Sequence, residues 1–310
     1  MDPMMKQKLS AFAEVFFVLS LIAGAAAYGL GPQTTPRPHF IVHGHRGARA
    51  KLPENTLPSF VYAVEQGVDF LEMDMAVTSD GEIVISHDPR INPVICQGPD
   101  GKRIVGEGPV IHSLTLAQVK TFDCGTIQNP KFTEQAPQPG TRIPRLDEVF
   151  TMVEKLKHSN AKKVQFNIET KIFADHPELT VTPEEFVKTF LAVVDRHHLR
   201  ARVVLQSFDY RTLETSKWLA PEVRISALSE NRKEDLAESV KKLKAEISSP
   251  DWEMLTAEAV EKLHAAGAQV HPWTANTPEA WTKLLEMKVD GIISDDPAAL
   301  IAWLKAKKLR

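Results

Sequence analysis

Three carboxylates in the sequence are placed where they could hold a divalent cation. Glu72 and Asp74 stand two positions apart in an apolar run that is typical of a β-strand, and residues at that spacing project from the same face of a strand. Glu169 ends a second such run. Oxygen ligands from neighbouring strands suit Ca²⁺ or Mg²⁺ better than zinc. We therefore expect one cation at Glu72, Asp74 and Glu169, and the sequence leaves both metals open.

Two histidines and two basic residues occupy similar positions at the ends of apolar runs. His45 and Arg46 follow the first run, His87 follows another, and Lys171 stands two residues after Glu169. A metal ion with an arginine and a lysine would neutralise a phosphate, while one histidine removes a proton and the other donates one. The set predicts cleavage of an anionic phosphate ester.

Short β-rich runs alternate with amphipathic stretches from Phe40 onward, which is the pattern of a parallel α/β fold. We expect nine strands, over residues 40–43, 69–75, 83–86, 164–169, 202–206, 224–228, 246–249, 269–273 and 291–294. The expected helices span residues 57–66, 116–122, 146–156, 183–197, 210–219, 233–243, 256–266, 278–287 and 297–305.

One of the nine strands should be the return arm of a β-hairpin. Only seven residues separate Met75 from Ile83, and they include Ser79-Asp80-Gly81. A parallel crossover needs a dozen residues or more, so residues 83–86 must turn back. Eight parallel strands remain, which predicts a TIM-type (β/α)8 barrel. Active sites of such barrels lie at the C-terminal ends of the strands, where the candidate residues stand.

The segment that follows the hairpin, about residues 88–145, has a different composition. It contains eight prolines, both cysteines and one convincing helix. We interpret it as a loop-rich insertion on the catalytic face. Cys96 and Cys124 could form a disulfide in an oxidising compartment, and the alternative is that both are unpaired core residues.

The first 30 residues predict a signal that directs export. A short basic segment precedes an apolar run from Val15 to Leu30, and Ala25-Ala26-Ala27 offers a cleavage site. The run is shorter than the roughly 20 residues of a spanning helix, which favours a cleaved signal peptide over an uncleaved membrane anchor. Residues 31–39 are expected to be a linker. Either interpretation places the domain outside the cytoplasm, most simply in a periplasm.

Composition limits the remaining function classes. The 310 residues include 43% hydrophobic and 25% charged residues, which is the globular range, and residues 40–310 are enough for one large barrel. The formal net charge of −3 lacks the basic excess of nucleic-acid-binding domains. We expect a small-molecule substrate and no nucleic acid.

Nine short blocks, spread over about residues 40–300, make the sequence resemble the glycerophosphodiester phosphodiesterase family. They are His43–Arg49, Pro53–Thr56, Glu72–Asp74, Thr78–Gly81, Ser86–Pro89, Glu169–Lys171, Gln206–Phe208, Trp273–Asn276 and Asp290–Asp295. The resemblance implies a barrel that hydrolyses glycerophosphodiesters to glycerol 3-phosphate and an alcohol.

The resemblance also implies roles for individual residues. It gives the acid and base roles to His45 and His87, the metal to Glu72, Asp74 and Glu169, and the phosphate to Arg46 and Lys171. Glu54 and Asn55 match polar positions beside the site, and Trp273 matches an aromatic wall of the pocket. The 2-hydroxyl of the glycerol would attack phosphorus intramolecularly, giving a cyclic phosphate that water then opens.

Two other functions fit the same residues. A related barrel could cleave lysophospholipids or another lipid phosphodiester, which an exposed apolar rim on the insertion would favour. A barrel that only binds glycerophosphodiesters would not need an acid and a base. Outside the site, we expect His43 to be a packed core residue rather than a pocket residue, and Trp218 to lie in the core.

Overall fold

The computed structural model describes residues 39–310, and the predicted export signal and nearly all of the predicted linker lie outside this range. The strands are β1 Ile41–Gly44, β2 Phe70–Val77, β3 Ile83–Ile85, β4 Gln165–Thr170, β5 Val203–Ser207, β6 Arg224–Ser229, β7 Ile247–Pro250, β8 Gln269–Val270 and β9 Gly291–Ser294. The helices are α1 Leu57–Gln66, α2 Leu116–Val119, α3 Leu146–Lys155, α4 Pro183–Arg196, α5 Tyr210–Leu219, α6 Leu236–Leu243, α7 Ala257–Ala265, α8 Pro278–Glu286 and α9 Pro297–Ala306.

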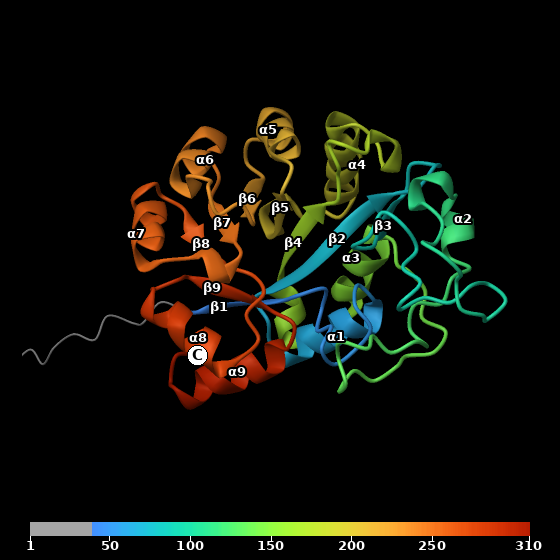
Figure 1. Cartoon of the computed structure of the whole chain (residues 1–310), viewed down its shortest axis with the longest axis horizontal. Coiled ribbons are helices and arrows are strands. Elements are labelled where there is room, and N and C mark those ends of the chain that lie inside the picture. Colours follow the sequence, from blue (N-terminus) through green and yellow to red (C-terminus); the bar gives the residue numbers. More distant parts are fainter. Residues whose placement is uncertain (1–38) are drawn as a thin grey trace, which may run out of the picture. The chain divides into compact units, whose positions relative to one another are not determined.

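The strands form a nearly closed parallel barrel with the helices outside it, as Figure 1 shows. Their order is β8-β7-β6-β5-β4-β2-β1-β9, and β3 pairs antiparallel with β2. Backbone hydrogen bonds connect the β8 segment to β9, for example from Ile293 N to Pro272 O at 3.0 Å. The predicted TIM-type barrel with its hairpin is therefore confirmed.

Capping residues followed by proline determine where several helices begin. Thr182, Thr277 and Asp296 each precede a proline, and each side chain accepts a hydrogen bond from the first turn of its helix. Several elements are shorter than expected, β8 and α2 most of all. β8 ends at Val270, before Pro272, which has no N–H to donate to a neighbouring strand. Within the described residues, no helix is long and apolar enough to cross a membrane.

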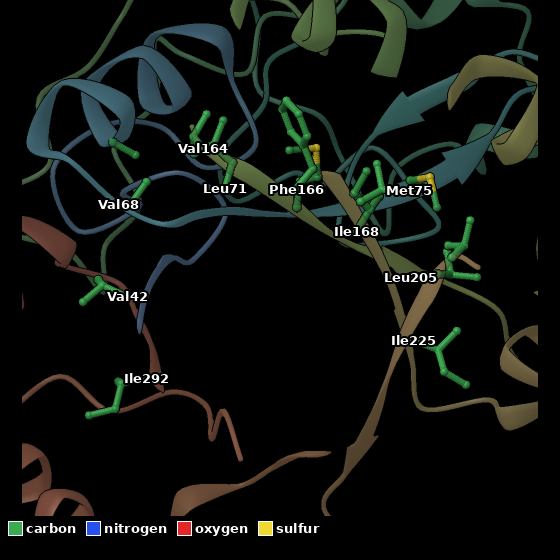
Figure 2. Close-up of a cluster of buried hydrophobic side chains, with 14 of the residues drawn as sticks. Val42, Val68, Leu71, Met75, Val164, Phe166, Ile168, Leu205, Ile225 and Ile292 are labelled. Atoms are coloured by element: carbon green, nitrogen blue, oxygen red, sulfur yellow. The ribbon is translucent and has the colours of Figure 1, made fainter. Parts of the chain in front are cut away.

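Successive side chains of a strand point to opposite faces of the sheet, and this separates the site residues from the main apolar core. On β2, Leu71, Met73 and Met75 belong to the large apolar cluster, while Glu72 and Asp74 lie on the other face. Figure 2 shows buried side chains of this cluster on the strands, among them Leu71, Met75, Phe166, Ile168, Leu205 and Ile225, with Val164 directly before β4. The helices cover these apolar faces, so the polar positions on β2 are free to face the barrel interior.

Two expectations about the core have different outcomes. His43 is fully buried and stacks on Phe70 with ring centroids 4.4 Å apart, so it is a core histidine. Trp218 was expected in the core, but it is 74% exposed. The buried face of α5 is formed by Thr212, Leu213 and Ser216, and Trp218 does not lie on that face.

The insertion packs on the hairpin through a small core of its own. That core joins Ala76 and Val84 of the hairpin to Ile91, Ile111 and both cysteines. Gln135 Nε2 also donates to Arg49 O at 2.7 Å, which ties the insertion to the loop after β1. Of its large apolar side chains, only Val94 and Val105 are exposed, so the structure gives no broad apolar rim.

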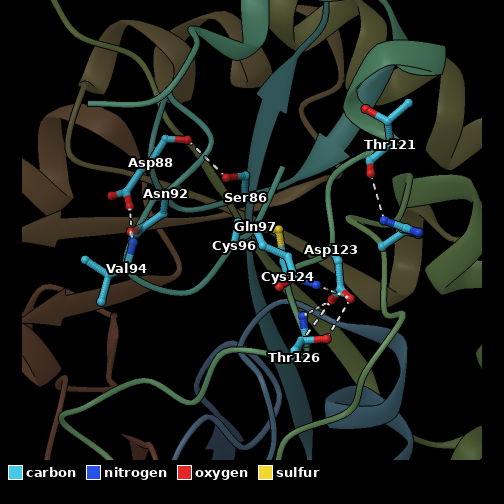
Figure 3. The surroundings of a disulfide bond; sticks show 12 residues. Ser86, Asp88, Asn92, Val94, Cys96, Gln97, Thr121, Asp123, Cys124 and Thr126 are labelled. Carbon is cyan, nitrogen blue, oxygen red and sulfur yellow. Dashed lines mark hydrogen bonds between the residues drawn. A yellow bond between two sulfur atoms is a disulfide. The ribbon is translucent and has the colours of Figure 1, made fainter. Parts of the chain in front are cut away.

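Cys96 and Cys124 form a disulfide within the insertion (Figure 3). Asp123, beside Cys124, accepts hydrogen bonds from Gly125 N at 2.9 Å and Thr126 Oγ1 at 2.7 Å, and these hold the loop on that side. The predicted pairing is present, and it links residues 28 positions apart.

Reduction of this disulfide should lower the free energy of unfolding by about 3–4 kcal/mol, from the entropy of the chain that it closes. Urea unfolding of the oxidised protein, the reduced protein and the Cys96→Ser/Cys124→Ser double variant would measure the change. The reduced protein and the double variant should agree. Equal stability of all three, or two free thiols in protein from an oxidising compartment, would contradict the prediction.

Candidate active site

A cavity of about 440 Å³ opens at the C-terminal ends of the strands. Its lining includes most of the predicted site residues, namely His45, Arg46, Glu72, His87, Glu169, Lys171 and Trp273. Asp74 and Asn55 lie buried beside these residues, and Asn55 Nδ2 donates to Asp74 Oδ2 at 2.8 Å. The structure therefore brings together side chains that are up to 228 positions apart in the sequence, the separation of His45 and Trp273.

Glu72, Asp74 and Glu169 form a buried cluster whose oxygen atoms lie within 4.8 Å of one another. Burial raises the pKa of Glu72, and the Asp74 and Glu169 carboxylates raise it further. Burial would also raise the pKa of Asp74, but the charges of His87 and Arg46 outweigh it and lower that pKa. Like charges held this close in a buried site favour a cation between them.

Two basic side chains balance only part of this negative charge. Arg46 Nη1 contacts Glu54 Oε1 at 2.7 Å, and Lys171 Nζ contacts Glu169 Oε1 at 2.7 Å. Counting Glu54 with the three-carboxylate cluster, four acidic groups face two basic ones. The buried Asn55 Oδ1 has no hydrogen-bond partner among residues 39–310. This oxygen-rich donor set fits a hard divalent cation.

Glycines shape the turn that carries His45 and Arg46. Arg46 has φ 49° and Gly47 φ 88°, a left-handed pair that reverses the chain after β1. A Cβ on Gly47 would lie 2.4 Å from Ser59 Oγ, so α1 packs directly against the backbone there. The turn aims Arg46 N at Glu72 Oε2, 2.9 Å away. The positive φ of Gly47 and its close approach to Ser59 explain why the sequence has glycine directly after His45 and Arg46.

His45 is held by a partner that the sequence analysis did not assign. Its Nδ1 lies 2.5 Å from Asp295 Oδ1, and its Nε2 lies 3.8 Å from Glu72 Oε2. Asp295 also accepts hydrogen bonds from Arg49 Nε at 2.5 Å and Asn276 Nδ2 at 2.8 Å. Burial and the charge of Arg49 lower the pKa of His45 to about 4, although Asp295 opposes the shift. The imidazole is therefore neutral at pH 7.

His87 is oriented by the first residues of the insertion. Its Nδ1 lies 2.9 Å from Asp88 Oδ1, and Asn92 Nδ2 donates to Asp88 Oδ2 at 2.6 Å. The side chain of His87 is about one-third exposed. The insertion thus fixes one side of the site, as well as packing on the hairpin.

Gln206 is a second residue whose role the sequence analysis missed. Its Nε2 donates to Glu72 Oε1 at 2.7 Å, and Asn167 Nδ2 donates to Gln206 Oε1 at 2.8 Å. Asn167 therefore fixes which way the Gln206 amide points. Both Gln206 and Asp295 stand at or directly after strand ends, so position at a C-terminal strand end was the available signal for both.

Comparison with protein-family models decides the family. The model of the glycerophosphoryl diester phosphodiesterase family matches residues 45–299, which contain every residue of the site described above. The chain belongs to this family. Among its relatives, the glycerophosphodiester phosphodiesterase of Caldanaerobacter subterraneus is 29% identical over 262 residues, covering 84% of this chain and 96% of that protein.

A second relative and two solved structures agree with this assignment. The Bacillus subtilis glycerophosphodiester phosphodiesterase is 28% identical over 295 residues, and the match covers 91% of this chain and 94% of that protein. A Silicibacter pomeroyi crystal structure assigned to the same activity has a TM-score of 0.82 and 28% identity, covering 88% of this chain and 95% of that one.

The second structure, an Oleispira antarctica phosphodiesterase in complex with sn-glycerol-3-phosphate, has a TM-score of 0.70 and 24% identity. The match covers 86% of this chain and 96% of the Oleispira antarctica chain, and it supports the shared barrel fold. The family and the curated relatives make this chain an enzyme that hydrolyses glycerophosphodiesters.

Proposed function

We propose that this glycerophosphodiester phosphodiesterase depends on one divalent cation, Ca²⁺ or Mg²⁺, and uses His45 and His87 as its base and acid. The observation that carries the proposal is that His45, His87, Glu72 and Glu169 line one cavity, with Asp74 buried directly beside it. A module that only bound its ligand would not need two histidines, each oriented by its own aspartate.

His45 takes the proton in the first step. Asp295 accepts the hydrogen bond of Nδ1–H, which leaves Nε2 as the basic nitrogen beside the cavity. The lowered pKa of His45 keeps that nitrogen unprotonated at neutral pH. It removes the proton of the glycerol 2-hydroxyl, whose attack on phosphorus is intramolecular and so gains from proximity.

His87 gives its proton to the departing alcohol, which leaves a cyclic phosphate on the glycerol. Asp88 holds His87 Nδ1, so Nε2 is the nitrogen that donates. In the second step the roles reverse, because His87 now lacks a proton and His45 has one. His87 removes a proton from water and the water oxygen attacks phosphorus. The bond between phosphorus and the 2-oxygen breaks, and His45 returns its proton to that oxygen. The product is glycerol 3-phosphate.

Glu72, Asp74 and Glu169 would hold the cation, with Asn55 Oδ1 available beside them. When bound, a divalent cation supplies positive charge that stabilises the developing charge on phosphate and lowers the pKa of a neighbouring hydroxyl. Arg46 and Lys171 line the same cavity and are suited to the phosphate oxygens.

Release of glycerol 3-phosphate from glycerophosphocholine tests this proposal. The chain without residues 1–27 would be assayed with Ca²⁺, with Mg²⁺ and with a chelator. We expect release with at least one metal and none with the chelator, and recovery when metal is added back. Full activity of chelator-treated, metal-free protein would overturn the metal requirement.

We further propose that the protein is exported, either with its N-terminal segment cleaved or with that segment retained as a membrane anchor. The Cys96–Cys124 disulfide supports an oxidising compartment such as a periplasm. Lysophospholipids are not favoured as substrates, because the apolar residues of the insertion mostly pack on the hairpin.

A further inference from the structure

The cavity has two chemically different halves. The strand order places β6 four strands from β1 in either direction, so the loops after these two strands face each other across the barrel mouth. One side of the cavity, formed by β1, β2 and β4, carries the histidines, the carboxylate cluster and the basic side chains. The opposite side carries Phe208 after β5, Leu228 and Glu230 at the end of β6, and Trp273 after β8.

Aromatic rings dominate the second half. Phe208 is 41% exposed, although it is a large apolar residue, and its ring lies edge to face with Trp273 at 5.5 Å between centroids. Trp273 Nε1 donates to Ser249 O at 2.8 Å, which fixes the indole in place. Two rings that are held open to a cavity form a surface on which a cation binds favourably.

Glu230 adds a negative charge to the same half. The carboxylates that line the cavity are Glu72, Glu169 and Glu230, and the first two belong to the buried cluster. Glu230 is exposed and has no ion-pair or hydrogen-bond partner for its carboxylate among residues 39–310. Arg232, close in sequence, pairs instead with Glu253 at 3.8 Å.

The basic residues that line the cavity are already paired. Arg46 contacts Glu54, Arg49 contacts Asp295, and Lys171 contacts Glu169. Lys171 Nζ also lies 6.0 Å from the centre of the Phe208 ring, but its charge is balanced by its carboxylate partner. The negative charge of Glu230 is therefore the unbalanced charge on the aromatic side.

The substrate must span both halves. If the glycerol supplies the attacking hydroxyl, it has to stay beside His45 and the carboxylates, so the alcohol group extends from phosphate toward the aromatic side. From this we infer that Phe208, Trp273 and Glu230 form a subsite for an alcohol that carries an ammonium group, which makes zwitterionic glycerophosphodiesters the preferred substrates. This inference rests on the proposed function, because it uses the same phosphate and glycerol positions.

Two diesters of the same shape test the inference. One is glycerophosphocholine, and the other is its 3,3-dimethylbutyl analogue, in which a carbon atom replaces the quaternary nitrogen. We expect the enzyme, loaded with its active metal, to favour the choline diester by about tenfold in kcat/KM. This ratio corresponds to the combined free energy of one cation–π contact and one exposed charge pair. Raising the salt concentration should reduce this ratio, because Glu230 is exposed to screening.

Two variants and a control locate the effect. Glu230→Gln and Phe208→Leu should each lower the ratio of kcat/KM values by about threefold. Glu279→Gln, which removes an exposed carboxylate on α8, should leave the ratio as it is. A ratio near one in the unmodified enzyme, or a ratio that Glu230→Gln does not change, would overturn the subsite while both diesters are still hydrolysed. Failure to hydrolyse either diester would overturn the proposed function instead.

Discussion

His45→Ala should lower kcat by about 10²–10⁴-fold, the usual contribution of a positioned general base. The substitution removes the nitrogen that faces the cavity, and it leaves Asp295 with its hydrogen bonds from Arg49 and Asn276. The loss should therefore appear in kcat rather than in folding. Steady-state hydrolysis of glycerophosphocholine, with thermal unfolding measured on the same samples, would separate the two.

The His45 prediction has two controls. His264→Ala removes a histidine on α7 that pairs with Asp290 at 2.9 Å outside the cavity, and it should retain activity. Asp295→Asn keeps the imidazole but weakens its orientation, so its kcat should fall by less than that of His45→Ala. A folded His45→Ala variant with near-normal kcat would show that another group is the base.

Glu72→Gln should weaken binding of the activating cation by more than about 100-fold, since loss of a residue that merely supports a metal ligand already costs 10–100-fold. The same change should alter the stability of the metal-free protein little, because the relief of like charge offsets the exchange of one acceptor oxygen for an amide donor that faces Arg46 N or Gln206 Nε2. It removes one of three like charges in a buried cluster, and burial together with Asp74 and Glu169 already raises the pKa of Glu72. A large loss of metal affinity with little change in the stability of the metal-free protein would distinguish this effect from misfolding.

Thermal unfolding with and without metal measures both effects. At 100 times its Kd, the cation should stabilise the unmodified enzyme by about 2.7 kcal/mol, while Glu72→Gln gains little. Glu261→Gln, on α7 outside the cluster, should respond to metal as the unmodified enzyme does. Equal metal stabilisation in Glu72→Gln and the unmodified enzyme would place the cation elsewhere.

Much of the barrel could be predicted from local patterns. The alternation of apolar residues on β2 placed Glu72 and Asp74 on one face, and the short gap between Met75 and Ile83 required a hairpin. The expected strands and helices are present, because caps, prolines and periodicity act within a few residues. The length of β8 was overestimated, because Pro272 interrupts an otherwise extended segment.

The sequence by itself determined which residue types stand at the strand ends, and through them the chemistry and the family. Only the tertiary structure decided their partners. Asp295 reaches His45 across 250 positions because closing the ring pairs β9 with β1. Gln206 reaches Glu72 across 134 positions because both side chains face the barrel interior, although β4 lies between their strands. A strand's period fixes the face on which a side chain lies, but the packing of the whole barrel fixes what that side chain meets there.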